Sequence, residues 1–296
     1  MLTTRRTRCG TLAFAALVGA TAGAVALPAG ASAARSGPVS VYYAASLQDI
    51  MEQHVGPRFE QATGYGFTGF SGASGTLANE IKGGIARGDV FVSANAATNN
   101  ILEGARNGNW VSWYLAIANS PLVLGYNPHG AFAAALKSEP WFKVVTRPGF
   151  RIGRTDPAVD PKGKLTVQAI TAAVQVYGST ALNAITTTSS DVYPEASLVG
   201  ELQSGQLDAG FSYASEAKGA GIPVVKLGKL FLAATYTVSV LRNAPDEKGA
   251  EAFVKYLLSK PGVALMRKEG LTVVKPRLIG PLASVPRSLR HLIPTP

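Results

Sequence analysis

The sequence predicts an α/β fold, in which a mostly parallel sheet carries helices on both faces. Short apolar runs alternate with segments whose apolar residues recur every three to four positions, which is the pattern of strands and helices in turn. The chain has 296 residues, enough to bury a sizeable core as one large or two modest domains.

The first set of elements is predicted as β-α-β-α-β. The expected strands are 39–45, 66–70 and 89–93, and the expected helices between them are 48–63 and 76–87. In the second helix, Leu77, Ile81 and Ile85 lie on one stripe that is expected to be buried. This order implies parallel strands joined by crossover helices.

A second set of elements follows. We expect strands at 122–126, 150–153, 209–213, 223–227 and 233–241, and helices at 164–177, 195–203 and 247–259. The last helix repeats apolar residues at i, i+3, i+4, i+7 and i+8 between Ala250 and Leu258. The segment 276–296 contains five prolines and is predicted to be an extended tail.

Residues 1–33 are predicted to be a secretory signal peptide. They begin with a segment that contains three arginines, continue as an apolar, Ala-rich run and end with small residues around Ala33. The apolar run is too short and too rich in Gly and Ala for a permanent membrane anchor. Cleavage after Ala33 removes Cys9, the only cysteine, so the mature chain needs no disulfide. We therefore expect a secreted or periplasmic protein.

The basic balance of the chain does not by itself identify a partner. The 28 Lys and Arg fall to 25 when the three arginines of the signal are lost, which against 18 Asp and Glu leaves a net charge of +7. A basic surface favours anionic partners through long-range attraction, but scattered lysines also keep a protein in solution. No basic run is interleaved with aromatic residues, so no nucleic-acid partner is expected.

The loops that follow the strands form the candidate site, because ligands of open α/β sheets bind at the carboxyl ends of the strands. Ser46 follows the first strand, and Ser74 lies in the Ser/Gly-rich loop 71–76 after the second. Each serine can be a plain helix cap, but hydroxyls and amides at helix N-termini also hold small anions. The loop 71–76 lacks the lysine of a P-loop and has no G-x-G-x-x-G, so a nucleotide is poorly supported.

Two acids lie after later strands. Asp160 belongs to the stretch D-P-A-V-D-P-K-G, and Glu195 follows Tyr193-Pro194. Asp-Pro commonly starts a helix, and the helix dipole favours an acid in the first turn, so both acids have a structural explanation. Their place on the expected ligand face gives them a second one, contact with a ligand.

An ordered set of motifs resembles the solute-binding proteins that deliver molybdate and tungstate to ABC transporters. The matching stretches are A-A-S-L (44–47), G-A-S-G-T-L-A (72–78), G-D-V-F-V-S-A-N (88–95), D-P-A-V-D-P-K-G (156–163), L-Q-S-G-Q-L-D-A-G-F-S-Y (202–213) and K-Y-L-L-S-K-P-G-V (255–263). Together they cover nearly all of the mature chain. The resemblance implies a two-lobed periplasmic-binding-protein fold of class II, with a mostly parallel, helix-flanked sheet in each lobe and two chain crossings.

The same resemblance implies how the chain is divided between the two lobes. Lobe 1 is expected at 38–119 and 236–275, and lobe 2 at 120–235. The lobes are expected to close on the ligand, so that the permease of an ABC importer can distinguish loaded from empty protein. The protein is expected to be a monomer, not an enzyme, and to need no cofactor besides its ligand, molybdate or tungstate.

The resemblance also assigns site residues. Ser46 and Ser74 match two serines whose hydroxyls and backbone amides hold the oxyanion from one lobe. Tyr213 matches a tyrosine that donates from the other lobe. Asp160 and Glu195 match the metal-coordinating aspartate and glutamate of members that bind tungstate as well as molybdate.

An acidic side chain in an anion-binding pocket requires a physical explanation. A carboxylate ~4 Å from a dianion is repelled by roughly twice the ~4 kcal/mol of a unit pair at an effective dielectric of 20. The acid can be protonated, turn away as a cap, accept a proton from the ligand, or bond to the metal atom. Hexavalent molybdenum and tungsten can expand from four to six oxygen ligands, whereas sulfur in sulfate cannot readily do so. We expect Asp160 and Glu195 to complete a six-coordinate site.

Two alternatives stay open at this point. A binding protein for another small oxyanion, such as phosphate or sulfate, would use the same loops, with an aspartate accepting the proton of hydrogen phosphate. A secreted hydrolase would need a serine nucleophile beside a histidine, but Ser71 in G-F-S-G-A misses the G-x-S-x-G elbow. His54, His129 and His291 stand in no zinc spacing or recognisable triad context.

Overall fold

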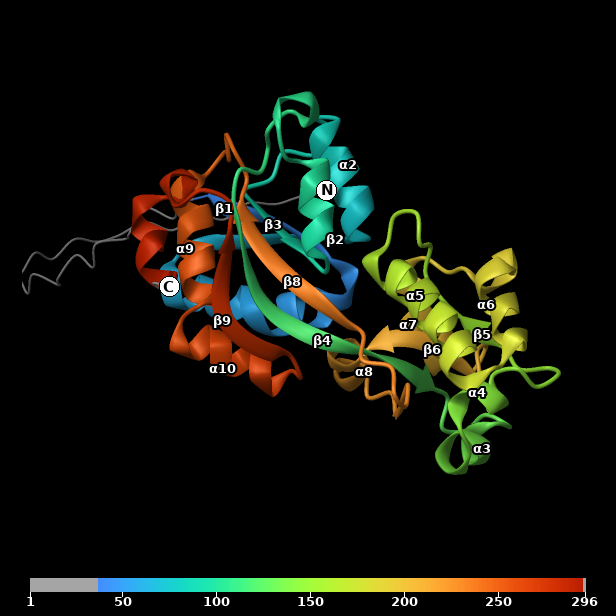
Figure 1. Cartoon of the computed structure of the whole chain (residues 1–296). Coiled ribbons are helices and arrows are strands. Elements are labelled where there is room, and N and C mark those ends of the chain that lie inside the picture. The colour runs from blue at the N-terminus through green and yellow to red at the C-terminus, as the bar shows by residue number, and fades with distance from the viewer. Residues whose placement is uncertain (1–36, 295–296) are drawn as a thin grey trace, which may run out of the picture. The chain divides into compact units, whose positions relative to one another are not determined.

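A computed structural model describes residues 37–294, so the predicted signal peptide, 1–33, lies outside the described residues. The description below concerns residues 37–294 only, which are drawn in colour in Figure 1. Within residues 37–294, no helix combines the length and the apolar character that a membrane span requires.

The strands of residues 37–294 form one hydrogen-bonded sheet system. They are β1 (Pro38–Ala44), β2 (Gly66–Gly72), β3 (Val90–Ser93), β4 (Tyr114–Tyr126), β5 (Ile152–Gly153), β6 (Ala209–Tyr213), β7 (Val224–Lys226), β8 (Ala233–Val240) and β9 (Thr272–Ile279). The order is β2-β1-β3-β8-β4-β6-β5, and β7 and β9 also pair with β4. β1 is parallel to β2 and β3, and β5 is parallel to β6, whereas β4 and β8 make antiparallel pairs.

Helices connect and cover these strands. They are α1 (Gly56–Thr63), α2 (Ser74–Lys82), α3 (Ala133–Ser138), α4 (Trp141–Val144), α5 (Pro161–Tyr177), α6 (Asn183–Thr187), α7 (Glu195–Gln203), α8 (Ala214–Gly219), α9 (Glu247–Leu257) and α10 (Lys260–Lys268). A 3₁₀ turn, Ala45–Leu47, and a π-helical segment, Ile50–Val55, lead into α1.

β4 belongs to two parts of the sheet. Its first half, up to Pro121, pairs with β8 and β9, and its second half, from Leu122, pairs with β6 and β7. Figure 1 shows β4 in green as one continuous strand between the elements near α10 and those near α3. Ser120, fully buried at the change of partners, accepts hydrogen bonds from the backbone N–H and the hydroxyl of Ser215. β4 therefore ties the two sets of strands together.

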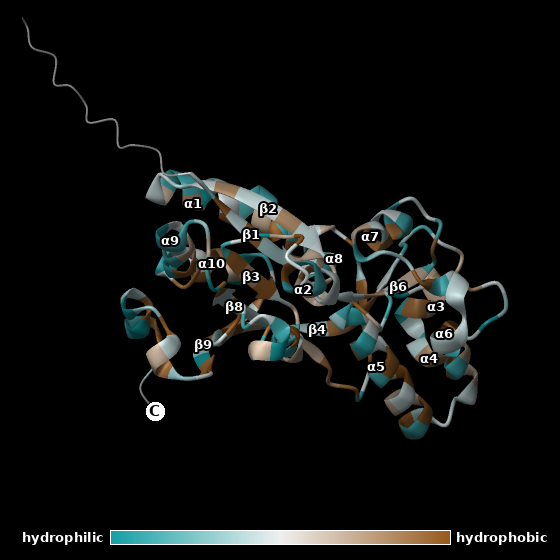
Figure 2. Ribbon diagram, turned by 90° about the horizontal axis from the view of Figure 1, so that it is seen from above, coloured by the Kyte–Doolittle hydropathy of each residue, from teal (hydrophilic) through white to brown (hydrophobic). Residues whose placement is uncertain are grey.

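The core follows the apolar periodicity of the helices. Ala250, Phe253, Val254 and Leu257 of α9 are buried, and α9 packs on β1 and β8. Figure 2 shows β3 as apolar and much of α9 as hydrophilic, as expected for a helix with one face on the core. The spacing read from the sequence therefore predicts the inner face of α9.

Most expected elements are confirmed, and β6 and α7 have the expected bounds. The helix expected at 76–87 is wrong at its C-terminal end, because α2 stops at Lys82 and Gly83 and Gly84 follow. Gly84 has a φ of 71°, in the left-handed region that glycine adopts at helix ends. Ile85 is consequently 83% exposed and does not join Leu77 on the buried stripe.

The C-terminal region differs most from the prediction. α10 was not expected, and the extended tail is wrong at its start, because residues up to Ile279 form β9 against β4. Pro276 is tolerated there because the pairing register shifts between Ala116 and Ala118, where the strand needs no regular ladder of N–H donors. Val285 and Leu289 are buried further along.

Candidate functional site

Each of the five predicted site residues lies where the chain enters a helix. They are Ser46 in the 3₁₀ turn after β1, Ser74 at the first position of α2, Asp160 at the N-cap of α5, Glu195 at the first position of α7, and Tyr213 at the N-cap of α8. Helix N-termini carry unpaired N–H groups and a partial positive charge, both of which suit an anion.

A direct contact joins two of these residues across 149 positions of the sequence. The backbone N–H of Ser46 donates to Glu195 Oε1 over 3.2 Å. Tyr213 belongs to the same neighbourhood, because Lys162 Nζ lies 5.8 Å from its ring centroid and 3.7 Å from Glu195 Oε1. Asp160 joins them through its Oδ1, which accepts from the backbone N–H of Lys162 at 2.8 Å.

Ser74 reaches this neighbourhood through the residues beside it. The N–H of Gly75 donates to the carbonyl of Val159 over 2.9 Å, so the start of α2 contacts the loop before α5. Ala73 and Thr76 line a cavity of about 280 Å³ together with Asp160 and Glu195. Of the five predicted residues, Asp160 and Glu195 line this cavity, whereas Ser46, Ser74 and Tyr213 are buried and do not line it.

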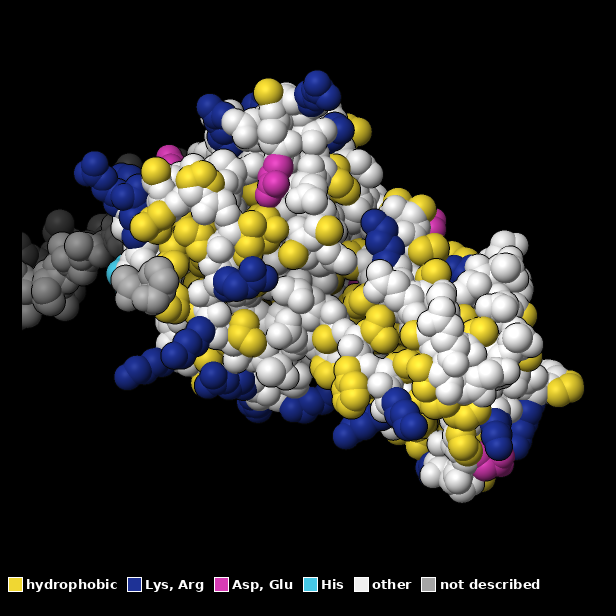
Figure 3. Space-filling model, in the orientation of Figure 1, with side chains coloured by type: hydrophobic (Ala, Val, Ile, Leu, Met, Phe, Trp, Pro, Cys, Tyr) yellow, Lys and Arg dark blue, Asp and Glu magenta, His cyan; other side chains and the backbone are white. Residues whose placement is uncertain are grey.

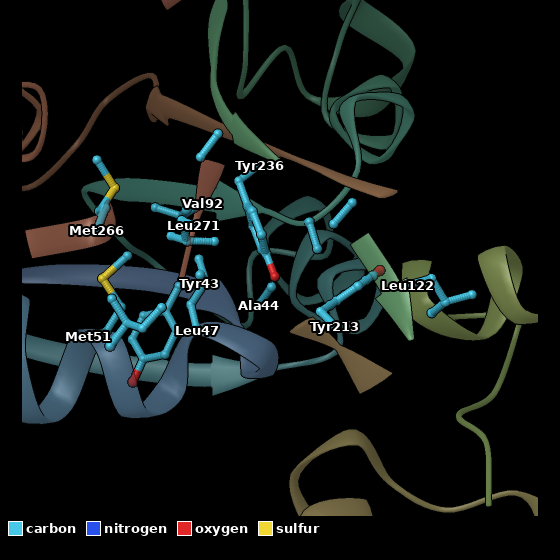
Figure 4. Close-up of a cluster of buried hydrophobic side chains, with 14 of the residues drawn as sticks. Tyr43, Ala44, Leu47, Met51, Val92, Leu122, Tyr213, Tyr236, Met266 and Leu271 are labelled. Atoms are coloured by element: carbon cyan, nitrogen blue, oxygen red, sulfur yellow. The ribbon is translucent and has the colours of Figure 1, made fainter. Parts of the chain in front are cut away.

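The hydroxyl protons of Ser46 and Ser74 remain available to donate a hydrogen bond. Ser46 Oγ accepts from the Tyr236 hydroxyl at 3.1 Å, and Ser74 Oγ accepts from the backbone N–H of Ala94 at 3.2 Å. A hydroxyl that accepts one hydrogen bond can still donate another. Figure 4 shows the Tyr236 hydroxyl beside Ala44, at the end of β1 that leads to Ser46.

The site concentrates buried polar atoms that have no hydrogen-bond partner. Seven such side-chain atoms occur among the described residues, and four belong to this site: Thr155 Oγ1, Asp160 Oδ2, Glu195 Oε2 and the Tyr213 hydroxyl. Leaving one buried polar group unsatisfied costs on the order of 1–3 kcal/mol, so native proteins rarely place several together without a functional reason. These four atoms are candidate ligand contacts.

Each buried acid has one oxygen in use and one oxygen free. Asp160 Oδ1 caps α5 and Glu195 Oε1 accepts from Ser46, which leaves Oδ2 and Oε2 unpartnered. Burial raises the pKa of Asp160, an effect that the Lys162 ammonium partly offsets. Burial, and then the neighbouring Asp160 carboxylate, raise the pKa of Glu195 well above its ordinary value. Both acids are thus buried at positions where ionisation of the carboxyl group is unfavourable in free energy.

Lys162 and Thr155 are site residues that the sequence reasoning missed. Lys162 is fully buried, and its ammonium lies 2.8 and 2.9 Å from the two carboxylate oxygens of Glu216. Burial alone lowers the pKa of Lys162, but the carboxylates of Glu216, Glu195 and Asp160 outweigh it and raise the pKa above its ordinary value. A lysine in the first turn of a helix opposes the helix dipole, and this local conflict is the signal that could have identified Lys162.

A larger cavity lies on the other side of the Ser46–Glu195 contact. It has a volume of about 450 Å³ and includes Gln48, Glu52 and Glu216 in its lining. Ser46 and Glu195 line this larger cavity, whereas Asp160 and Glu195 together line the smaller one, so the smaller cavity is the better candidate for contact with both acids. Among the described residues, neither cavity has Lys, Arg or His in its lining.

The excess of positive charge among the described residues lies in the C-terminal part of the chain. Residues 38–241 carry fourteen basic and fourteen acidic side chains, whereas residues 242–294, which include α9, α10 and β9, carry ten basic and four acidic ones. Figure 3 shows Lys and Arg distributed over the surface of the face in view.

The histidines lie apart from the candidate site. His54 Nε2 is 3.7 Å from Glu269 Oε1, and His129 and His291 are exposed. Ser71, the serine closest to a nucleophile motif, donates instead to Gln48 Oε1 at 3.0 Å. The described residues therefore place no histidine beside Ser71.

Comparison with known proteins gives a consistent fold. The structure is similar to the periplasmic molybdate-binding protein of Azotobacter vinelandii, with a TM-score of 0.62 and 21% identity over 81% of this chain and 100% of that one. It is also similar to a sulfate-binding protein of Mycobacterium tuberculosis, with a TM-score of 0.62 and 16% identity over 88% of this chain and 92% of that one. The fold is therefore the two-lobed fold of periplasmic binding proteins, as expected.

Sequence relatives agree with the fold. A Haloferax volcanii protein provisionally named as an ABC transporter molybdenum-binding protein is 31% identical over 149 residues, 50% of this chain and 46% of that one, so the match spans about half its length. The molybdate/tungstate-binding protein WtpA of Pyrococcus abyssi is 22% identical over 237 residues, 62% of this chain and 68% of that one. The model of the bacterial extracellular solute-binding protein family matches residues 39–272, well over half of the sequence. The chain belongs to this family.

Proposed function

We propose that the protein is the extracytoplasmic binding component of an ABC importer and that it captures molybdate or tungstate. One observation carries the proposal: Asp160 and Glu195 line the same cavity, and each presents one buried carboxylate oxygen without a partner. The names of the Haloferax and Pyrococcus relatives support the same class of ligand.

The chemistry of the free oxygens favours a metal-centred oxyanion. Two carboxylates repel a dianion that can only accept hydrogen bonds, whereas molybdenum and tungsten accept carboxylate oxygens as additional hard ligands. The ligand's own oxygens are held by hydroxyl donors, for which Ser46, Ser74 and Tyr213 are the candidates. Asp160 and Glu195 then complete a six-coordinate metal.

Hydrogen phosphate is the second candidate ligand. A free carboxylate oxygen can accept its proton, and the unpartnered Oδ2 of Asp160 is such an acceptor. Sulfate carries no proton at neutral pH and cannot expand its coordination, so the same carboxylates disfavour it. The fold does not decide between these ligands, because its structural neighbours include proteins named for molybdate and for sulfate.

The proposal includes the setting in which the protein works. The signal peptide is cleaved after Ala33, and the mature protein acts as a monomer outside the cytoplasm, where it delivers its ligand to a permease. It needs no cofactor of its own and does not bind nucleic acid. A catalytic role is not proposed, because the family is one of solute-binding proteins and the histidines lie apart from the site.

Calorimetric titration of the purified protein with tungstate, molybdate, phosphate and sulfate tests the proposal. We expect tungstate and molybdate to bind, and Asp160→Ala and Glu195→Ala each to weaken tungstate binding roughly 10- to 100-fold, as loss of a metal-site interaction does. Asp156→Ala is the matched control, because Asp156 lines the same cavity but is exposed. Undiminished affinity in both buried-acid variants contradicts coordination, and preferential phosphate binding supports the second candidate.

A further inference from the structure

Lys162 occupies the centre of a buried cluster of acids. Its side chain is fully buried, its ammonium lies 2.8 and 2.9 Å from the two oxygens of Glu216, and Glu195 Oε1 is 3.7 Å away. The carboxylate of Asp160 is held by the backbone N–H of the same lysine. One lysine therefore contacts or adjoins three acids.

The helix that contains Lys162 does not explain its position. Lys162 is the second residue of α5, where the helix dipole disfavours a cation. Taking its charge out of water is also costly unless the geometry of its partners compensates. The reason for a lysine here has to lie in its tertiary contacts.

Glu216 is anchored independently of Lys162. Its Oε2 accepts from the Ser212 hydroxyl at 2.7 Å and from the backbone N–H of Tyr213, the N-cap residue of α8, at 3.3 Å. An anchored carboxylate that binds the ammonium through both oxygens fixes where the lysine charge lies. Glu216 therefore fixes the position of the Lys162 ammonium, and the ammonium in turn lies 3.7 Å from Glu195 Oε1.

Glu195 is the acid whose position depends most on this charge. Its Oε1 has Ser46 N–H and the Lys162 ammonium as neighbours, and its Oε2 has no partner. The nearby Asp160 carboxylate repels it. Without the lysine, nothing positively charged among the contacts of Glu195 would oppose that repulsion.

We propose that Lys162 is a positioning residue that balances and orients the Glu195 carboxylate, so that its free oxygen stays available to the metal atom of the bound oxyanion. The inference rests on the function proposed above and deepens it. Lys162 thereby determines specificity: it makes the site selective for oxyanions whose central atom can accept a carboxylate. The ligand itself does not have to touch the ammonium.

The experiment combines tungstate titration with X-ray absorption at the tungsten edge, which reports the number of oxygen neighbours. Lys162→Met removes the charge and keeps the length of the side chain, and Lys162→Gln keeps hydrogen-bonding capacity without charge. In either variant we expect roughly 10- to 100-fold weaker tungstate binding and loss of one oxygen neighbour. Lys162→Arg should restore the coordination number. Lys164→Met, on an exposed position of the same helix, should change neither quantity.

A double-mutant cycle separates positioning from a general structural role. If Lys162 acts through Glu195, Lys162→Gln should weaken tungstate binding in the natural sequence but have little further effect in a Glu195→Gln background. Equal losses in both backgrounds overturn the inference. If the neutral single variants fold poorly, Lys162→Arg, which keeps the charge, still tests the inference: loss of an oxygen neighbour in that variant despite the retained charge overturns it.

Failure of this inference is distinguishable from failure of the proposed function. If the natural protein binds no tungstate, or binds it with four oxygen neighbours, the coordination proposed for Asp160 and Glu195 is wrong and the inference falls with it. If the natural protein binds tungstate with six oxygen neighbours and Lys162→Met and Lys162→Gln do the same with unchanged affinity, the role of Lys162 alone is refuted.

Discussion

The backbone N–H of Ser46 donates to Glu195 Oε1 over 3.2 Å, and this hydrogen bond joins the loop after β1 to the N-terminus of α7. An internal carboxylate thus occupies a donor that the family resemblance assigns to the oxyanion. If an oxyanion binds as proposed, it has to share the Ser46 amide with Glu195 or take its place. On that proposal, the charge and the proton of Glu195 influence both ligand binding and the stability of the free protein.

The raised pKa of Glu195 predicts how the stability of the ligand-free protein depends on pH. Burial and the Asp160 carboxylate raise this pKa well above its ordinary value of 4.5. A group with a raised pKa binds its proton more tightly in the folded state, so its contribution is fully present below 4.5 and is lost as the pH rises through the folded-state value. We expect the free energy of unfolding to fall over that interval.

Urea unfolding at a series of pH values measures this effect. Glu195→Gln cannot ionise, so its free energy of unfolding should depend less steeply on pH than that of the natural protein. Asp160, whose pKa is also raised, should still contribute a remaining slope of the same sign. A difference between natural protein and variant that is the same at every pH would contradict the prediction.

Two neighbouring tyrosines offer a matched pair of substitutions. The rings of Tyr213 and Tyr236 pack edge to face with centroids 6.1 Å apart, and Figure 4 shows both beside the buried apolar cluster. The Tyr236 hydroxyl donates to Ser46 Oγ, whereas the Tyr213 hydroxyl has no partner. Removal of the two hydroxyls should therefore have different effects.

We expect Tyr236→Phe to lower the free energy of unfolding by about 0.5–1.5 kcal/mol, the usual value of a hydrogen bond. Tyr213→Phe should leave the stability of the ligand-free protein unchanged or raise it, yet weaken tungstate binding. Denaturant unfolding and calorimetry on both variants measure these effects. A Tyr213→Phe protein that is less stable but binds tungstate normally would show that the hydroxyl serves the fold alone.

The close approach of Gly75 to Val159 predicts a steric block. A Cβ atom at Gly75 would lie 2.4 Å from the Val159 carbonyl oxygen, a backbone atom that cannot turn aside. Gly75→Ala should push the start of α2 away from the loop before α5 and weaken tungstate binding. Gly200→Ala is the control, because Gly200 is exposed in α7 with no atom within 4 Å of its added Cβ.

Solution scattering adds a measurement of closure. In the natural protein, tungstate or molybdate should reduce the radius of gyration, because the lobes are expected to close on the ligand. Gly75→Ala should reduce this change, whereas Gly200→Ala should preserve it and stabilise α7 by up to about 1 kcal/mol. An unchanged radius of gyration in the natural protein on ligand addition would count against closure.

The parts of the fold that local pattern encodes were predictable. α9 has apolar residues at helical spacing, and α7 and β6 have their expected bounds. The first half of β4 was missed because almost every residue from Tyr114 to Ser120 is buried, which removes the alternation that marks a strand, and Pro121 reads as a break. The prolines from 276 onward predict a tail and conceal β9, because Pro276 lies at an irregularity in the pairing of β9 with β4.

The candidate site was predictable to a similar extent. Hydroxyls and acids at the ends of strands are visible in the sequence, and the structure places Ser46, Asp160, Glu195 and Tyr213 in one neighbourhood. Their roles in binding stay predictions. Lys162 escaped notice because its burial depends on Glu216, which lies 54 positions further along the chain. The conflict with the helix dipole marks Lys162 as unusual, but a pairing at that separation leaves no local pattern that identifies its partner.

The pairing of β4 with both parts of the sheet has a consequence for unfolding. Because this one strand is hydrogen-bonded to β8 and β9 in its first half and to β6 and β7 in its second, neither half of the sheet can come apart without exposing backbone of the other. Melting should therefore be a single cooperative transition, with the amide protons of β4 among the slowest to exchange with solvent. The strand that joins the two sets of strands also makes them fold and unfold together.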